Sequence, residues 1–149
     1  MATVEVTFTP LPAHVRTARL VATAVARRSG VDESLLDEVR LAVGEACSRA
    51  VEAHRKHCPR APIRVALTDD TERFEVVVTD AAPTEAPAEA MSAELAPSFK
   101  TPAADGAPHQ LPPEVGLAVI SGLADDVRVM AAEGGTSIAM SWKRRTGSA

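Results

Sequence analysis

Hydrophobic and polar residues alternate along three stretches of the chain, at residues 4–8, 63–67 and 73–80. A two-residue period is typical of a strand that buries one face, and Pro10 follows the first of these stretches. A short polar segment joins the second stretch to the third. The pattern therefore predicts an N-terminal strand and, later in the chain, a β-hairpin.

Two other stretches have the three- and four-residue spacing of helices. The first begins at Pro12, which suits the first turn of a helix, and ends before Gly30, which suits a C-terminal cap. The second follows Asp32, a candidate N-cap, and ends before Pro59. Its periodic apolar residues are Leu36, Val39, Val43, Ala46, Ala50 and Ala53. We expect this face to lie in the core.

The C-terminal third repeats both patterns. A short apolar helix is predicted over residues 115–124, and two strands, 126–132 and 136–142, turn at Gly134 and Gly135. Helices and strands are thus grouped rather than strictly alternating. This order predicts an α+β fold: a two-layer sandwich with helices on one face of a mainly antiparallel mixed sheet.

Between these parts, residues 81–113 hold seven of the chain's eleven prolines and few large apolar side chains. Such a segment buries too little surface to offset the entropy of ordering. We expect a mobile, lid-like loop, with residues 84–110 as the first site of limited proteolysis.

Length and composition narrow the class of protein. A chain of 149 residues with 46% hydrophobic residues predicts one domain with a full core. A net charge of -4, with the main basic run at residues 143–145, argues against a nucleic-acid partner. No apolar run reaches the roughly 20 residues of a membrane span, which predicts a cytoplasmic protein.

The histidines and cysteines do not predict a metal site. His54, His57 and Cys58 lack the second ligand pair of a recognised zinc spacing. Cys47 and Cys58 are expected to be reduced thiols rather than a disulfide.

The stretch LAVGEACSRAVEAH, residues 41–54, places Glu45 and Arg49 one helical turn apart on one face. The simplest interpretation is a surface ion pair worth a few tenths of a kcal/mol. Asp80 and Gly116 also have simple interpretations, since Asp80 could form a turn through its own side chain and Gly116 could permit close packing.

Three segments, LAVGEACSRAVEAH, VVVTDAAP and EVGLAVISGLADDVRV, together with the order of elements, resemble the histidine-kinase-like (GHKL or Bergerat-type) ATPase superfamily. Within it, the chain looks most like the bacterial anti-sigma-factor serine kinases. By this resemblance Glu45 matches the general base and Asp80 the ligand of the adenine amino group. Gly116 and Leu117 match the second glycine of the lid-closing pair and the leucine after it.

Three positions depart from the family pattern, all on the nucleotide side of it. Arg49 stands where the family has a magnesium-binding Asn, Ala82 where it has a Gly, and Glu114 where it has the first lid glycine. Arg has no acceptor for Mg²⁺, and Glu114 would place negative charge near phosphates. The family histidine, eight residues after the Glu, is Ala53 here, with His54 one place later.

The departures predict weak or absent binding of ATP and Mg²⁺, although Arg49 could instead contact phosphates directly. We also expect Arg49 to pair with Glu45, lower the pKa of Glu45 and so make it a poor base.

The leading hypothesis is an anti-sigma-factor-like regulator of a partner-switching circuit. It would bind a sigma factor, its antagonist protein, or both, and the family resemblance favours a homodimer. The alternative is an active serine kinase that phosphorylates the antagonist with ATP and Mg²⁺. A third hypothesis is a silent binding domain for an unrelated ligand.

Overall fold

The computed structural model describes residues 2–83, 113–132 and 134–144 of the chain. Its elements follow the order expected from the sequence. They are β1 (Ala2–Phe8), α1 (Pro12–Arg28), the 3-10 turn η1 (Glu33–Leu35), α2 (Leu36–His57), β2 (Ile63–Asp69), β3 (Arg73–Asp80), α4 (Pro113–Leu123), β4 (Asp126–Ala132) and β5 (Gly135–Lys143).

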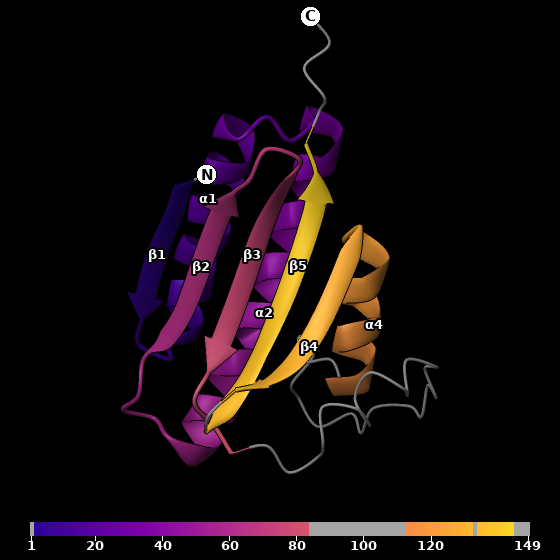
Figure 1. Ribbon diagram of the computed structural model, residues 1–149. Coiled ribbons are helices and arrows are strands. Elements are labelled where there is room, and N and C mark those ends of the chain that lie inside the picture. The colour runs from indigo at the N-terminus through magenta and orange to yellow at the C-terminus, as the bar shows by residue number, and fades with distance from the viewer. Residues whose placement is uncertain (1, 84–112, 133, 145–149) are drawn as a thin grey trace, which may run out of the picture.

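The five strands form one sheet in the order β1-β2-β3-β5-β4. Helices α1, α2 and α4 lie together on one face of this sheet, as Figure 1 shows. The two-layer α+β sandwich predicted from the sequence is therefore confirmed. All four neighbouring strand pairs are antiparallel, so the expected admixture of parallel pairing is absent from the described strands.

Local sequence explains where the first helices begin and end. Pro12 occupies the first turn of α1, where its missing N–H costs no hydrogen bond. Gly30, at φ 90°, adopts the left-handed conformation that ends α1, and the Val31 N–H donates back to the Ala26 carbonyl over 3.1 Å. The Asp32 carboxylate then accepts the Ser34 N–H over 3.1 Å and starts η1.

The core lies between the sheet and helix α2, the central helix of the layer. Trp142 and Phe74, on neighbouring strands, are fully buried, and their ring centroids lie 6.3 Å apart. The Trp142 indole N–H donates to the Leu123 carbonyl over 2.9 Å, which ties β5 to the end of α4. Cys47 is buried in this core and its pKa is raised to about 12, so it is an unreactive free thiol.

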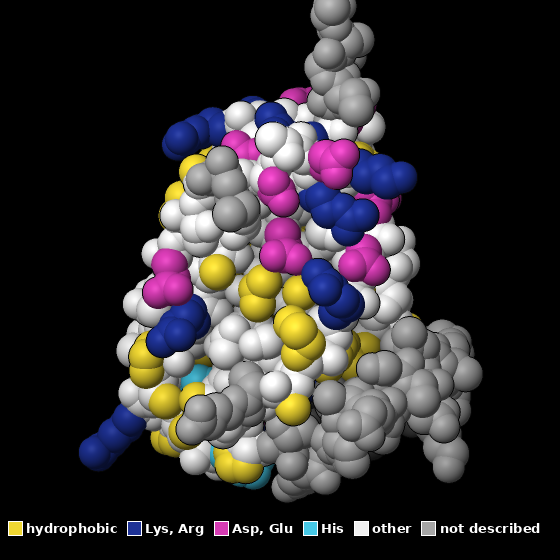
Figure 2. All heavy atoms as spheres, in the orientation of Figure 1, with side chains coloured by type: hydrophobic (Ala, Val, Ile, Leu, Met, Phe, Trp, Pro, Cys, Tyr) yellow, Lys and Arg dark blue, Asp and Glu magenta, His cyan; other side chains and the backbone are white. Residues whose placement is uncertain are grey.

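None of the described helices lies over the other face of the sheet, which we call the open face (Figure 1). Along its middle row, the β-register aligns Glu5, Ala66, Val77, Ala139 and Arg128 across the five strands. Figure 2 shows hydrophobic side chains gathered over the middle of this open face, with acidic and basic side chains beside them. The charged side chains form ion pairs, including Arg128 with Glu75 at 3.4 Å and Arg64 with Glu5 at 4.0 Å.

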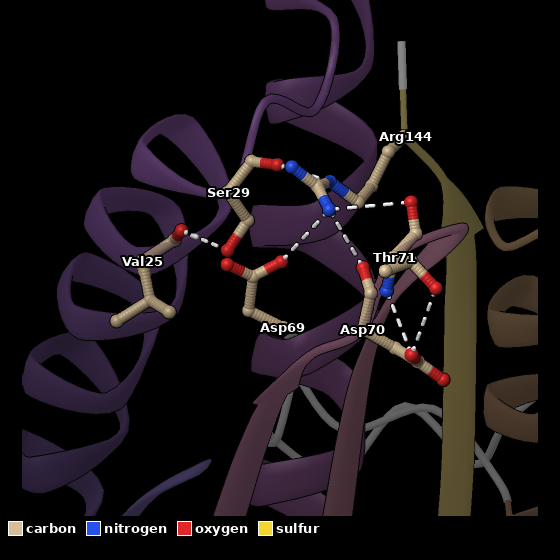
Figure 3. A network of polar contacts seen from close by, with 6 residues as sticks. All are labelled: Val25, Ser29, Asp69, Asp70, Thr71 and Arg144. Carbon is tan, nitrogen blue, oxygen red and sulfur yellow. Dashed lines mark hydrogen bonds and ion pairs between the residues drawn. The ribbon is translucent and has the colours of Figure 1, made fainter. Parts of the chain in front are cut away.

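At one end of the sandwich, Arg144 joins three segments of the chain (Figure 3). Its Nε donates to the Ser29 carbonyl after α1. Its Nη1 donates to the Asp70 and Thr71 carbonyls over 2.8 and 3.2 Å, and lies 3.5 Å from an Asp69 carboxylate oxygen. The guanidinium therefore fastens the β2–β3 turn to the end of α1.

Two further expectations from the sequence concern the lid-like loop and the absence of a membrane span. The lid-like loop falls almost wholly on residues 84–112, which lie outside the described residues, although α4 begins at Pro113. Among the described helices, none combines the length and apolar character needed to cross a membrane.

Candidate functional site

The site begins with Glu45 in the middle of α2, which faces the first turns of α4. A Cβ added at Gly116 would lie 3.0 Å from the Glu45 Oε2 atom. A side chain at Gly116 would therefore crowd the carboxylate. The close packing expected of Gly116 is real, and its neighbour is the residue that matches the family's base.

Burial decides the protonation behaviour of Glu45. Loss of hydration raises the pKa of this carboxyl above its usual value, and the nearby Arg49 charge lowers it by less. The expectation that Arg49 would lower the net pKa of Glu45 is therefore wrong. The sequence shows the neighbouring charge but not the extent of burial, which has the larger effect here.

Arg49 interacts with two carboxylates rather than one. Burial lowers the pKa of its guanidinium, while the charges of Asp80 and Glu45 raise it, and Asp80 has the larger effect of the two. Glu45 and Arg49 do interact electrostatically, since each charge shifts the pKa of the other. The Arg49 charge is thus attracted to Asp80, at the end of β3, as well as to Glu45 on its own helix.

Asp80, the last residue of β3, is held by backbone donors. Its Oδ1 atom accepts the Ala82 N–H over 3.1 Å and the Thr136 N–H over 3.3 Å. The turn through its own side chain, one of the two interpretations from the sequence, is confirmed. Burial raises the pKa of Asp80 despite these two bonds and the charge of Arg49, so the carboxylate is poorly hydrated.

The backbone around Asp80 is closely packed. A Cβ added at Gly135 would lie 1.9 Å from the Asp80 carbonyl oxygen, so only glycine allows β5 to start beside the end of β3. Ala82 is only 2% exposed, and no non-glycine residue in the described part of the chain has positive φ. The Ala82 methyl group thus fits beside Asp80 without backbone strain.

His54 is the residue of this site whose place the sequence did not indicate. Its side chain is fully buried at the C-terminal end of α2. The Ala81 N–H donates to its Nε2 over 2.8 Å, and its Nδ1 lies 2.9 Å from the Ala61 carbonyl. The only hint in the sequence is that His54 stands one residue after the position of the family histidine.

Two of the predicted site residues take less part in this arrangement. Leu117 is 3% exposed and belongs to the hydrophobic core. Glu114 lies in the first turn of α4, but its side chain is outside the described residues. Within residues 2–83, 113–132 and 134–144, no group of three His, Cys, Asp or Glu side chains is placed to hold a metal.

The donor set can be tested against the magnesium ion that the family uses with ATP. Mg²⁺ requires oxygen ligands, and the Arg49 guanidinium offers only N–H donors. The two acids Glu45 and Asp80 both interact electrostatically with the Arg49 guanidinium. The residues at this position do not fit a magnesium-bridged nucleotide.

The chain matches the family described as histidine kinase-like ATPase domain over residues 8–142. It belongs to that family. The match extends from the end of β1 almost to the end of β5 and includes every residue of the candidate site. No functionally curated protein matches the chain significantly.

Two solved structures are similar in fold. The first holds the RsbU and RsbW domains of Rv1364c from Mycobacterium tuberculosis, with 19% identity and a TM-score of 0.64 over 97% of this chain. This chain spans only 34% of that one. The second is the mycobacterial sensor histidine kinase MprB, with 18% identity and a TM-score of 0.59, covering 97% of this chain and 99% of that one.

Proposed function

We propose that this protein is an anti-sigma-factor-like regulator of a partner-switching circuit, in which binding of ATP and Mg²⁺ is weak or lost. It binds a sigma factor, the antagonist of an anti-sigma factor, or both. The observation that supports this most is that Arg49, a residue that offers no metal ligand, stands where the charges of both Glu45 and Asp80 act on it. The likeness to a structure that contains an RsbW domain supports the regulatory class.

The electrostatics of the site support weak nucleotide binding in a second way. Arg49 could in principle replace part of the charge of a metal ion toward phosphates. Two carboxylates already act on that charge, and both have pKa values raised by burial. When ionised, these two acids offset the Arg49 charge, so the guanidinium is a weak substitute for a divalent metal ion toward a triphosphate.

The open face of the sheet is the surface we assign to the protein partner. Its middle is apolar, at Ala66 and Val77, and ion pairs such as Arg128 with Glu75 border it. An apolar centre with a polar rim is the usual anatomy of a protein interface. A homodimer, suggested by the family resemblance, is part of the proposal and is tested by the molar mass in solution.

An active serine kinase is the second candidate, and one observation favours it. The raised pKa of Glu45 makes this carboxylate a stronger base than a hydrated Glu. In that case ATP would bind with Mg²⁺, Glu45 would take the proton of a serine hydroxyl on the antagonist, and Asp80 would bind adenine.

Calorimetry with ATP, with and without Mg²⁺, separates the two candidates. The regulator should bind ATP only weakly, with no gain from Mg²⁺, whereas micromolar magnesium-dependent binding would establish the kinase hypothesis in its place.

Co-purification from the native cell extract should recover a sigma factor or an antagonist protein. Val77→Asp should abolish that recovery, and Ser48→Asp, at an exposed position of α2 on the opposite layer, should preserve it.

A further inference from the structure

His54 connects three parts of the chain through one buried ring. It lies in the last turn of α2, and its two ring nitrogens contact the backbone at Ala61, before β2, and at Ala81, after β3. Neither contact is used by the proposed function. Both groups are main-chain atoms, so their roles as donor or acceptor are fixed.

These roles determine the state of the ring. A carbonyl oxygen can only accept, so Nδ1 must donate to Ala61. The Ala81 N–H can only donate, so Nε2 must accept and therefore bears no proton. The ring is neutral, with its hydrogen on Nδ1. Because the side chain is 0% exposed, water cannot replace either partner without opening the structure.

Ala81 lies between two residues of the candidate ligand site in the sequence. On one side is Asp80, whose Oδ1 accepts the Ala82 and Thr136 amides. On the other is Ala82, which is buried beside it. His54 thus accepts the Ala81 amide, while the Asp80 carboxylate accepts the amide of the next residue, Ala82.

We propose that His54 is a positioning residue, which holds the end of β3 so that the Asp80 carboxylate keeps its hydrogen bonds with the Ala82 and Thr136 amides. Its functional meaning rests on the proposed role of Asp80 in the site. The hydrogen bond itself does not, because both of its partners are groups of this chain. Failure of the proposed function would leave the geometry intact, so the two can be tested apart.

The first test uses the unaltered protein labelled with ¹⁵N. An N–H···N hydrogen bond transmits a scalar coupling between its two nitrogens, so NMR should detect a coupling between the Ala81 amide nitrogen and His54 Nε2. The ring should show the pattern of the Nδ1–H tautomer. The Nε2–H tautomer, or a missing coupling in a well-resolved spectrum, would overturn the proposal.

The second test uses two variants that each keep half of the bridge. An Asn amide reaches about as far as Nδ1 and can donate to Ala61, while a Gln amide oxygen reaches about as far as Nε2 and can accept from Ala81. His54→Asn should lower the exchange protection of the Ala81 amide by at least about tenfold, and His54→Gln should preserve most of it.

The titration of Asp80 separates positioning from a merely structural role. Followed by ¹³C NMR of the carboxyl carbon, its midpoint should shift in His54→Asn and stay near that of the unaltered protein in His54→Gln. Equal Asp80 midpoints in two folded variants that differ at Ala81 would contradict the positioning role. If neither variant folds, the coupling and tautomer measured in the unaltered protein decide the matter.

Discussion

Gly116 packs against the Glu45 carboxylate so closely that a Cβ at residue 116 would lie 3.0 Å from Oε2 and require the carboxylate to shift. The packing of α2 against α4 and the surroundings of a candidate base therefore depend on the same missing side chain. Glycine within a helix costs about 0.5–1 kcal/mol relative to alanine, so this arrangement is retained at some expense of stability.

Gly116→Ala tests this relationship against a matched control in the same helix. Gly122 has no heavy atom within 4 Å of an added Cβ, so Gly122→Ala should stabilise the protein by about 0.5–1 kcal/mol. Gly116→Ala should gain clearly less, or lose stability, because Glu45 must move. Denaturant unfolding measures both, and an equal gain in the two variants would show that Glu45 yields freely.

Glu45→Gln should change the pH dependence of stability. Because burial raises the pKa of Glu45 in the folded chain, stability should fall as pH rises from its ordinary value of 4.5 through the raised folded value. Glu45→Gln removes this loss, so its Tm should exceed that of the unaltered protein at pH 7. The difference should vanish below pH 4.5.

Glu52→Gln, on the same helix, is a control of opposite sign. It removes an exposed interaction with Lys56 at 3.8 Å and should cost a few tenths of a kcal/mol at pH 7. A Glu45→Gln protein that is less stable than the unaltered one at neutral pH would mean that the attraction of Arg49 outweighs burial.

Restoring the family residues should restore magnesium-dependent ATP binding. Arg49→Asn alone supplies an oxygen ligand but leaves the buried Ala82 methyl and the Glu114 charge, so little gain is expected. The triple change Arg49→Asn, Ala82→Gly, Glu114→Gly should raise affinity at least about tenfold, or about 1.4 kcal/mol, by calorimetry with Mg²⁺. Arg49→Lys, which keeps the charge and adds no oxygen, should show no gain.

Arg144→Ala should loosen one end of the sandwich. It removes donors to the Ser29, Asp70 and Thr71 carbonyls together with the ion pair to Asp69, which should cost about 1.5–3 kcal/mol of unfolding free energy. Hydrogen exchange should accelerate in the β2–β3 turn and at the end of α1.

The control for this change is Arg40→Ala, which breaks an exposed ion pair with Asp37 at 3.2 Å within one helix turn. That pair is worth no more than about 0.5 kcal/mol. Equal losses in the two variants would show that the Arg144 contacts add nothing beyond an ordinary surface ion pair.

Much of the fold could be predicted from periodicity, because each element has its own local signal. The alternation at Val76 and Val78 marks β3, and the caps at Gly30 and Asp32 mark helix ends. The pairing of β3 with β5 has no such signal, since the two strands are separated by about 55 residues whose turns do not specify the neighbour. The sheet was expected to be mainly antiparallel with some parallel pairing, and all of its described strand pairs are antiparallel.

The family resemblance predicts the candidate site as a set of positions but not as an electrostatic arrangement. Glu45, Asp80 and Gly116 were identified through the family pattern, and the structure brings Gly116 against Glu45. Asp80 raises the pKa of Arg49 more than Glu45 does, and this depends on how α2 packs against β3. The direction in which the pKa of Glu45 shifts depends on burial. Neither follows from spacing along one helix.

The strand order gives the protein a direction of assembly. Of the described strands, β5 is the last to be synthesised, yet it lies between β3 and β4 rather than at the edge of the sheet (Figure 1). Until residues 135–143 emerge, β3 has an open edge and β4 has no partner among the described strands. The Thr136 amide that binds Asp80 arrives with the same segment, so the candidate site and the sheet are completed in one late step of vectorial folding.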